Sequence, residues 1–266
     1  MGWLTYWASP SYRRRVQANA RAAGVPAPVV RQSIAEAGRL IAELPYLWLR
    51  PAGEPLAGVS WQGAELIESA LAQGHGMLLL TPHLGCFEVT AQAYAERFGS
   101  GAHPITVLYR PARKPWVREL EETSRARPNL ATAPASLAGV RQMIRALRRA
   151  EVVGLLPDQV PPEGMGVWAP FFGQPAYTMT LATRLVQQTG AVPLLIWGER
   201  LAGGAGYRVH VSDLGATLPS GEGSNSEAAQ AESAAIVNRA MERLILQCPQ
   251  QYLWGYNRYK SPRSAT

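Results

Sequence analysis

The stretch GMLLLTPHLGCFE, residues 76–88, decides how this chain folds. Residues 76–81 form a short apolar run of strand length, and Pro82 ends it because proline has no N–H to give to a sheet. Residues 85–98 then return to a helical pattern. A buried strand that passes directly into a helix is typical of an open α/β sheet, and such sheets bind their ligands at this junction.

Strand-like and helical stretches alternate along the rest of the sequence. The patterns predict strands at 76–81, 105–109, 152–156, 192–198 and 207–211. They predict helices at 29–49, 61–73, 85–98, 114–125, 136–149, 178–188 and 228–248. Strands separated by helices of about 10–15 residues indicate a mostly parallel sheet flanked by helices. We therefore expect an α/β fold, with a helical N-terminal segment at residues 1–50 and one main domain at residues 51–266.

The composition describes a basic chain that can bury a sizeable core. Of its 266 residues 47% are hydrophobic, and 26 Lys+Arg against 19 Asp+Glu give a net charge of +7. This charge favours anionic partners but does not choose among phospholipid headgroups, phosphorylated sugars and nucleic acid. No apolar run approaches the ~18–20 residues of a membrane-spanning helix. Residues 2–7, GWLTYW, followed by three arginines at 13–15, fit either a foot at a membrane interface or an ordinary amphipathic terminus packed on the body.

His83 and Glu88 are the residues of the opening stretch that can carry chemistry. If His83 precedes the helix and Glu88 lies in its first turns, the carboxylate can reach one ring nitrogen, and the other nitrogen can take a proton from a substrate hydroxyl. Gly85 leaves room for close approach of substrate or backbone, and backbone N–H groups near it could stabilise an oxyanion. A bare His-x4-Glu spacing equally fits a histidine that caps a helix or packs in a core. We expect Cys86 to be a packed thiol rather than a nucleophile.

Several common site patterns are missing from the sequence. It contains no GxSxG, no GxxxxGK[ST] and no GxGxxG after a strand, which argues against serine hydrolases, P-loop proteins and dinucleotide-binding enzymes. Its two cysteines form no pair or cluster with zinc spacing. The sequence therefore requires no metal and no cofactor.

The surroundings of His83 resemble a known family. Residues 81–88, TPHLGCFE, are similar to the His-x4-Asp/Glu signature of glycerolipid-type acyltransferases, in the form used by the late acyltransferases of lipid A. Further blocks match in order at 107–111 (VLYRP), 155–159 (LLPDQ), 171–176 (FFGQPA) and 251–260 (QYLWGYNRYK). The chain departs from the family in two places. Members usually carry an apolar membrane helix ahead of the basic segment where this chain starts, and Asn257 stands where histidine or arginine is commoner.

The resemblance implies a glycerolipid acyltransferase-like fold and a secondary acylation of a lipid A precursor. The donor would be an acyl carrier protein thioester, and the acceptor a hydroxyl of an anionic glycolipid. His83 and Glu88 would be catalytic. Substrate-binding roles would fall on Arg110, Asp158, Gln159, Gly85, Phe172 and Gly173. We expect no nucleic-acid partner, and a location at the cytoplasmic face of the bacterial inner membrane, either peripheral or anchored by a missing N-terminal helix.

Two alternatives stay open at this point. The acceptor could be another lipid, such as a lysophospholipid or an amino-acid lipid, or the chain could be a catalytically inactive, basic membrane-binding protein. The basic residues carry the same ambiguity. Arg113, Lys114 and Arg118 fit an acidic carrier protein or an anionic lipid as well as a solvated helix face, and a second arginine group at 141–149 is expected to be mainly solvated. Acyl chain length, acceptor position and oligomeric state are not fixed by the sequence.

Overall fold

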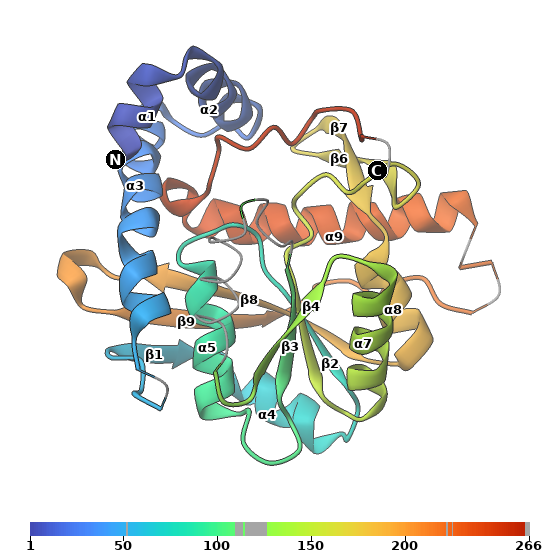
Figure 1. Cartoon of the computed structure of the whole chain (residues 1–266). Helices are drawn as coiled ribbons and strands as arrows, with labels where there is room; N and C mark the ends of the chain where they lie inside the picture. The colour runs from blue at the N-terminus through green and yellow to red at the C-terminus, as the bar shows by residue number, and fades with distance from the viewer. Residues whose placement is uncertain (52, 110–113, 115–126, 222, 225, 264–266) are drawn as a thin grey trace.

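The computed structural model describes all residues except 52, 110–113, 115–126, 222, 225 and 264–266 (Figure 1). Its helices are α1 (Gly2–Ala8), α2 (Pro10–Ala22), α3 (Ala27–Leu49), α4 (Ala64–Ala72), α5 (Phe87–Arg97), α7 (Leu137–Arg148), α8 (Leu181–Thr189) and α9 (Glu227–Gln247), with 3-10 turns η1 (Ala202–Gly204) and η2 (Pro249–Gln251). Its strands are β1 (Val59–Gln62), β2 (Met77–Leu80), β3 (Ile105–Tyr109), β4 (Leu130–Pro134), β5 (Val152–Leu155), β6 (Gly166–Phe171), β7 (Gln174–Met179), β8 (Val192–Arg200) and β9 (Tyr207–Asp213). Apart from Lys114, the helix predicted at 114–125 lies outside the described residues.

The centre of the molecule is a seven-stranded sheet in the order β1-β9-β8-β2-β5-β3-β4. Neighbouring strands are parallel except at β8 and β9, which pair antiparallel. The α/β fold with a mostly parallel sheet is thus confirmed. The opening stretch supplies β2, which lies between β8 and β5 and is buried along its whole length.

Helices cover both faces of the sheet. The inner strands therefore bury apolar side chains on both of their sides. Along β2, Leu78 and Leu80 face a core that includes residues of α7, α8 and α9. Met77 and Leu79 face a second core that includes residues of α3, α4 and α5. This period-two alternation divides the hydrophobic interior into two layers.

The N-terminal helices pack beside the sheet rather than apart from it. Gly2 of α1 lies so close to α3 that a Cβ there would stand 1.8 Å from the Ile34 carbonyl oxygen. Arg200 at the end of β8 forms ion pairs with Glu36 and Glu43 of α3, which ties α3 to the sheet edge. The helical N-terminal segment is therefore confirmed. Among the described residues, none of the helices has both the length and the apolarity to cross a bilayer.

Two predicted helices begin three residues later in the structure than the sequence patterns indicated. Residues 59–62 form the edge strand β1, and Gly63, with φ +80°, turns the chain into α4. The helix expected at 178–188 begins at Leu181, because the two residues 178–179 finish β7.

The β6–β7 hairpin was not predicted, and its turn explains why. The two turn residues, Phe172 and Gly173, both have positive φ, at 46° and 72°. That backbone suits the two-residue turn of a hairpin, but phenylalanine is an unusual residue for it. The Phe172 amide donates to the Glu242 carboxylate at 2.7 Å, and its ring packs on Trp254 at 5.9 Å between centroids. Tertiary contacts therefore hold a conformation that the local sequence does not favour.

Candidate active site

Two adjacent parallel strands bring His83 and Asp158 together. Leu80, the last residue of β2, is in register with Leu155, the last residue of β5. His83 and Asp158 each follow these partners by three residues, so both side chains lie at the carboxyl edge of the sheet. This edge is the ligand-binding side of open α/β sheets, as the sequence predicted.

Asp158 fixes the His83 ring through two hydrogen bonds. The Nδ1 atom of His83 lies 2.7 Å from Asp158 Oδ1, and the backbone N–H of His83 donates to Asp158 Oδ2 at 2.9 Å. Tyr252, whose side chain is buried, donates its hydroxyl to the same Oδ2 at 3.2 Å. Asp158 therefore accepts from three donors and is only 2% exposed. The pair is built to hold one ring orientation.

The electrostatic surroundings keep Asp158 ionised. Burial acts to raise its pKa, but the charge that His83 carries when protonated, the hydrogen bonds from His83 and the charge of Arg258 together hold the pKa below its usual range. An ionised carboxylate can only accept, so the proton between the two side chains sits on Nδ1. Nε2 is left as an acceptor in the neutral ring.

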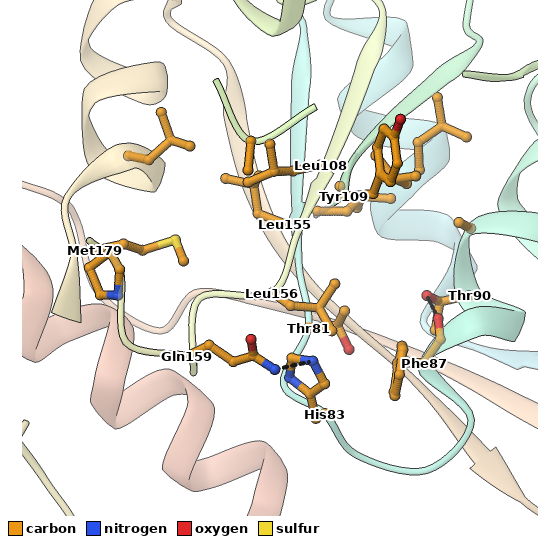
Figure 2. A pocket seen from close by; sticks show the side chains of 18 of the residues that line it. Thr81, His83, Phe87, Thr90, Leu108, Tyr109, Leu155, Leu156, Gln159 and Met179 are labelled. Carbon is orange, nitrogen blue, oxygen red and sulfur yellow. Dashed lines mark hydrogen bonds between the residues drawn. The ribbon is translucent and has the colours of Figure 1, made fainter. Parts of the chain in front are cut away.

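The Nε2 atom of His83 faces Gln159, as Figure 2 shows. The Gln159 side-chain Nε2 lies 2.9 Å from it, and with Nδ1 protonated the amide is the donor. The His83 ring also packs edge-on against Phe87, with centroids 4.9 Å apart. The acceptor nitrogen of the ring is thus held in place and hydrogen-bonded to a side-chain amide.

Glu88 lies in the first turn of α5 and lines the same cavity as His83. The hydrogen bonds described above give the two ring nitrogens of His83 to Asp158 and Gln159. The sequence assigned Asp158 and Gln159 to substrate binding and the ring contact to Glu88. The role of Glu88 as the catalytic partner of His83 stays a prediction.

Gly85 packs closely against the backbone of Gly198. The sequence predicted that Gly85 leaves room for either substrate or backbone, and the structure shows backbone there. Its φ is +60°, and a Cβ there would stand 2.0 Å from the Gly198 carbonyl oxygen. Its N–H donates to the Gln251 carbonyl at 3.0 Å, and the next amide, of Cys86, donates to the Gly198 carbonyl at 2.8 Å. These two amides are engaged in structure, so an oxyanion must find its donors elsewhere in the site.

A cavity of about 640 Å³ opens beside His83. Its volume falls within the range of about 300–1,000 Å³ usual for small-molecule sites. One end is lined by His83, Glu88 and Gln159, and the interior end reaches between the sheet and α5 to Leu79 and Ile105. In Figure 2, Leu108, Leu155 and Leu156 lie above the histidine and glutamine. The lining is mostly apolar, and His83, Glu88 and Gln159 are among its polar groups.

A second, smaller cavity of about 160 Å³ shares His83 and Gln159 with the first. It is lined by Tyr12 from α2, by Tyr252 and Tyr256 from the C-terminal segment, and by Asp158, Leu253 and Gly255. The ring of Tyr12 lies against Gly255 so closely that a Cβ there would come within 1.9 Å of Tyr12 Cε2. The histidine is therefore reachable from two spaces of different character.

Two of the remaining predicted site residues, Phe172 and Gly173, lie away from both cavities. They form the β6–β7 turn. Arg110, Arg113 and Arg118 are outside the described residues.

Two site residues were missed by sequence reasoning, Tyr252 and Arg258. Arg258 is 2% exposed and donates to the Tyr177 carbonyl and to the Thr178 hydroxyl, both at 2.7 Å. Both residues lie in the QYLWGYNRYK block, which the sequence marked without assigning roles. A buried arginine needs compensating charge, and Asp158 supplies it.

A histidine held by a buried carboxylate beside a mostly apolar cavity is the arrangement of a candidate general base next to a site for an apolar ligand. The family of bacterial lipid A biosynthesis acyltransferases matches residues 19–261. The chain belongs to this family and is an acyltransferase.

Individual relatives are more distant. The lipid A biosynthesis palmitoleoyltransferase of Escherichia coli K12 is 24% identical over 234 residues, which are 88% of this chain and 72% of that protein. The lauroyltransferase of the same organism is 28% identical over 200 residues, 75% of this chain and 61% of that protein. A lipid A biosynthesis acyltransferase of Haemophilus influenzae is 23% identical over 192 residues, 72% of this chain and 56% of that protein.

Proposed function

We propose that this protein transfers a fatty acyl chain from an acyl carrier protein thioester to a hydroxyl of a lipid A precursor, with His83 as general base. One observation carries the proposal: His83 has an ionised carboxylate on Nδ1 and presents Nε2 where an apolar cavity and a second cavity meet. General bases of this kind need both a fixed tautomer and access to the substrate hydroxyl. Membership of the lipid A acyltransferase family supports the choice of donor and acceptor.

The reaction begins when the acceptor hydroxyl takes the place of the Gln159 amide at Nε2. His83 removes the hydroxyl proton as the oxygen attacks the thioester carbonyl, and Asp158 stabilises the imidazolium that forms. The tetrahedral intermediate then collapses, the C–S bond breaks, and the imidazolium proton passes to the leaving thiolate. The products are an ester and a free thiol. The buried Cys86, whose thiol pKa is raised by burial, takes no part.

The displaced Gln159 amide is a suitable oxyanion donor. It lies at hydrogen-bond distance from the atom that accepts the proton, so a small rotation keeps it near the reacting carbonyl. The start of α5 adds the positive end of a helix dipole close to Phe87. We assign the oxyanion to these groups in place of the Gly85 amide.

Glu88 keeps a separate place in the proposal. As the second member of the His-x4-Glu motif it lies in the first turn of α5 and lines the same large cavity as His83. We propose that Glu88 is a catalytic partner of His83 in this cavity. Comparing the kcat of Glu88→Gln with that of Asp158→Asn decides which carboxylate stabilises the His83 imidazolium.

The two cavities divide the substrates. The large cavity suits the acyl chain, because each buried methylene contributes about 0.8 kcal/mol. The smaller cavity, with its tyrosines, suits the hydroxyl-bearing part of the acceptor, because tyrosine offers an apolar ring and a polar tip. Arg110, outside the described residues, remains a proposed ligand for an acceptor phosphate.

We place the protein at the cytoplasmic face of the inner membrane, where carrier thioesters are made. Met1, before α1, and Leu4 and Trp7 of α1 are exposed, at 72%, 65% and 64%. Exposed apolar and aromatic residues in this short segment, followed by Arg13, Arg14 and Arg15 of α2, suit attachment to an anionic bilayer surface.

The test is a transfer assay with a panel of acyl carrier protein thioesters and several lipid acceptors. Product masses are expected to show one acyl chain added to a lipid A precursor, with a preferred chain length. A lysophospholipid and an amino-acid lipid serve as parallel acceptors. Transfer only to one of these would overturn the acceptor, and no transfer by folded wild type to any acceptor would overturn the enzyme assignment.

A further inference from the structure

Two adjacent helices, α7 and α8, begin at the mouth of the large cavity. Leu137, the first residue of α7, and Leu181, the first residue of α8, both line it. Leu137 is nonetheless 72% exposed. The rim of the cavity therefore carries an apolar side chain that solvent can reach.

A stripe of arginines continues from this rim along α7. Arg141, Arg145 and Arg148 follow Leu137 at intervals of four, four and three residues, which places all of them on one helical face. Each of the three arginines is exposed. The opposite face is buried by Met143, Ala146 and Leu147. The stripe therefore points away from the protein along its full length.

The neighbouring helix adds to the same surface. On α8, Arg184 is exposed and lies three residues after Leu181. The two helices contact each other and lie on the opposite side of the molecule from α1 and α3 (Figure 1). Neither helix contains an aspartate or glutamate, and none of these four arginines forms an ion pair with a described residue.

We infer that the α7–α8 face is the docking site for an acidic carrier protein that delivers the acyl thioester. This face consists of Arg141, Arg145, Arg148 and Arg184, with Leu137 at the end nearest the large cavity. The inference rests on the proposed function, because it names the surface through which the proposed donor reaches His83. A carrier bound there would hold its thioester arm at the cavity mouth, and the acyl chain would enter ahead of it.

The composition of the face favours a protein over a bilayer. A membrane contact needs apolar and aromatic residues at headgroup depth, as α1 has. Beyond Leu137, the exposed stripe on α7 consists of arginines alone. Like charges at regular spacing across two helices complement an acidic protein surface, where they mainly raise the association rate and set its salt dependence.

The experiment compares two donors that carry the same acyl chain, one on acyl carrier protein and one on neutral pantetheine. The test variant is Arg141→Glu/Arg145→Glu, with Arg184→Glu as an independent second variant. The control is Arg21→Glu/Arg31→Glu, which makes the same charge change on exposed arginines of α2 and α3. We expect KM for the carrier donor to rise about tenfold or more in the double variant and to lose most of its salt dependence. In the double variant, kcat/KM for the pantetheine donor should stay within about twofold of wild type. In the control variant, kcat/KM for both donors should stay within about twofold of wild type.

Direct binding of labelled acyl carrier protein separates this inference from the proposed function. If wild type binds the carrier through these arginines yet forms no ester, the docking face stands and the proposed reaction fails. An unchanged carrier affinity and KM in both variants would overturn the docking face. An equal loss of kcat/KM with both donors would also overturn it. A loss of binding to anionic vesicles with carrier binding intact would overturn it too, and would assign the face to the bilayer.

Discussion

Changing Asp158 to asparagine tests the orientation of His83 most sharply. The carboxylate accepts from the ring Nδ1, from the His83 backbone amide and from Tyr252. An asparagine has one acceptor oxygen and one amino group, so it cannot accept from both N–H groups of His83. If its oxygen takes the backbone amide, its amino group meets Nδ1 and drives the ring to the tautomer with a protonated Nε2. That tautomer cannot accept the hydroxyl proton.

The expected loss is large and falls on the chemical step. In the serine protease triad the same replacement lowers kcat about 10⁴-fold, equivalent to about 5 kcal/mol. We expect Asp158→Asn to lower kcat by about 10³–10⁴-fold, with KM for donor and acceptor little changed, because neither cavity changes shape. Initial rates of ester formation at saturating substrates measure this, and circular dichroism confirms folding. A folded Asp158→Asn that keeps more than a tenth of wild-type kcat would refute the assignment, most plainly if Glu88→Gln were inactive beside it.

Three further predictions concern the same framework. Gly85→Ala should lower the thermal midpoint and abolish activity together, since a Cβ would stand 2.0 Å from the Gly198 carbonyl oxygen at a backbone φ of +60°; wild-type stability in this variant would contradict the packing. Gly154→Val places a side chain in the acyl cavity against Val107, so kcat/KM should fall about fourfold for each methylene displaced and the preferred chain should shorten, as a donor panel would show. Because the folded pKa of Asp158 is depressed, its ionisation stabilises the fold above about pH 4, and this stability is lost as pH falls through the folded pKa. Thermal midpoints measured from about pH 7 to about pH 3 should therefore fall more steeply for wild type than for Asp158→Asn, and parallel curves would refute this.

The sequence predicted those parts of the fold that local patterns encode. The strand ranges at β2, β3 and β5 follow from short apolar runs, and α7 follows from its single apolar stripe and its Ser136 cap. The hairpin escaped because Phe172 and Gly173 are held in their turn by Glu242 and Trp254, which are about 70 residues or more away in the sequence.

The candidate site shows the same division. His83 was found because it follows a buried strand, and Asp158 was found because the LLPDQ block resembles the family. Their pairing was not, because they lie 75 residues apart and only the strand order places β2 beside β5. Sequence spacing favoured Glu88, five residues on, as the partner of the ring. Tyr252 and Arg258 could not be assigned for a similar reason, since their contacts with Asp158 depend on how the C-terminal segment returns across the sheet edge.

The central claim is that His83 removes the acceptor proton in a direct transfer from thioester to hydroxyl. The most direct measurement is a single-turnover reaction with excess enzyme, in which ester formed on a lipid A precursor is followed for wild type and for His83→Ala. The account predicts that the wild type converts the donor to ester without an acyl-enzyme adduct detectable by mass spectrometry. It predicts that folded His83→Ala, with donor binding intact, is slower by at least about 10³-fold. An ester-forming rate within tenfold of wild type in His83→Ala, or an acyl group found on Cys86, would contradict it.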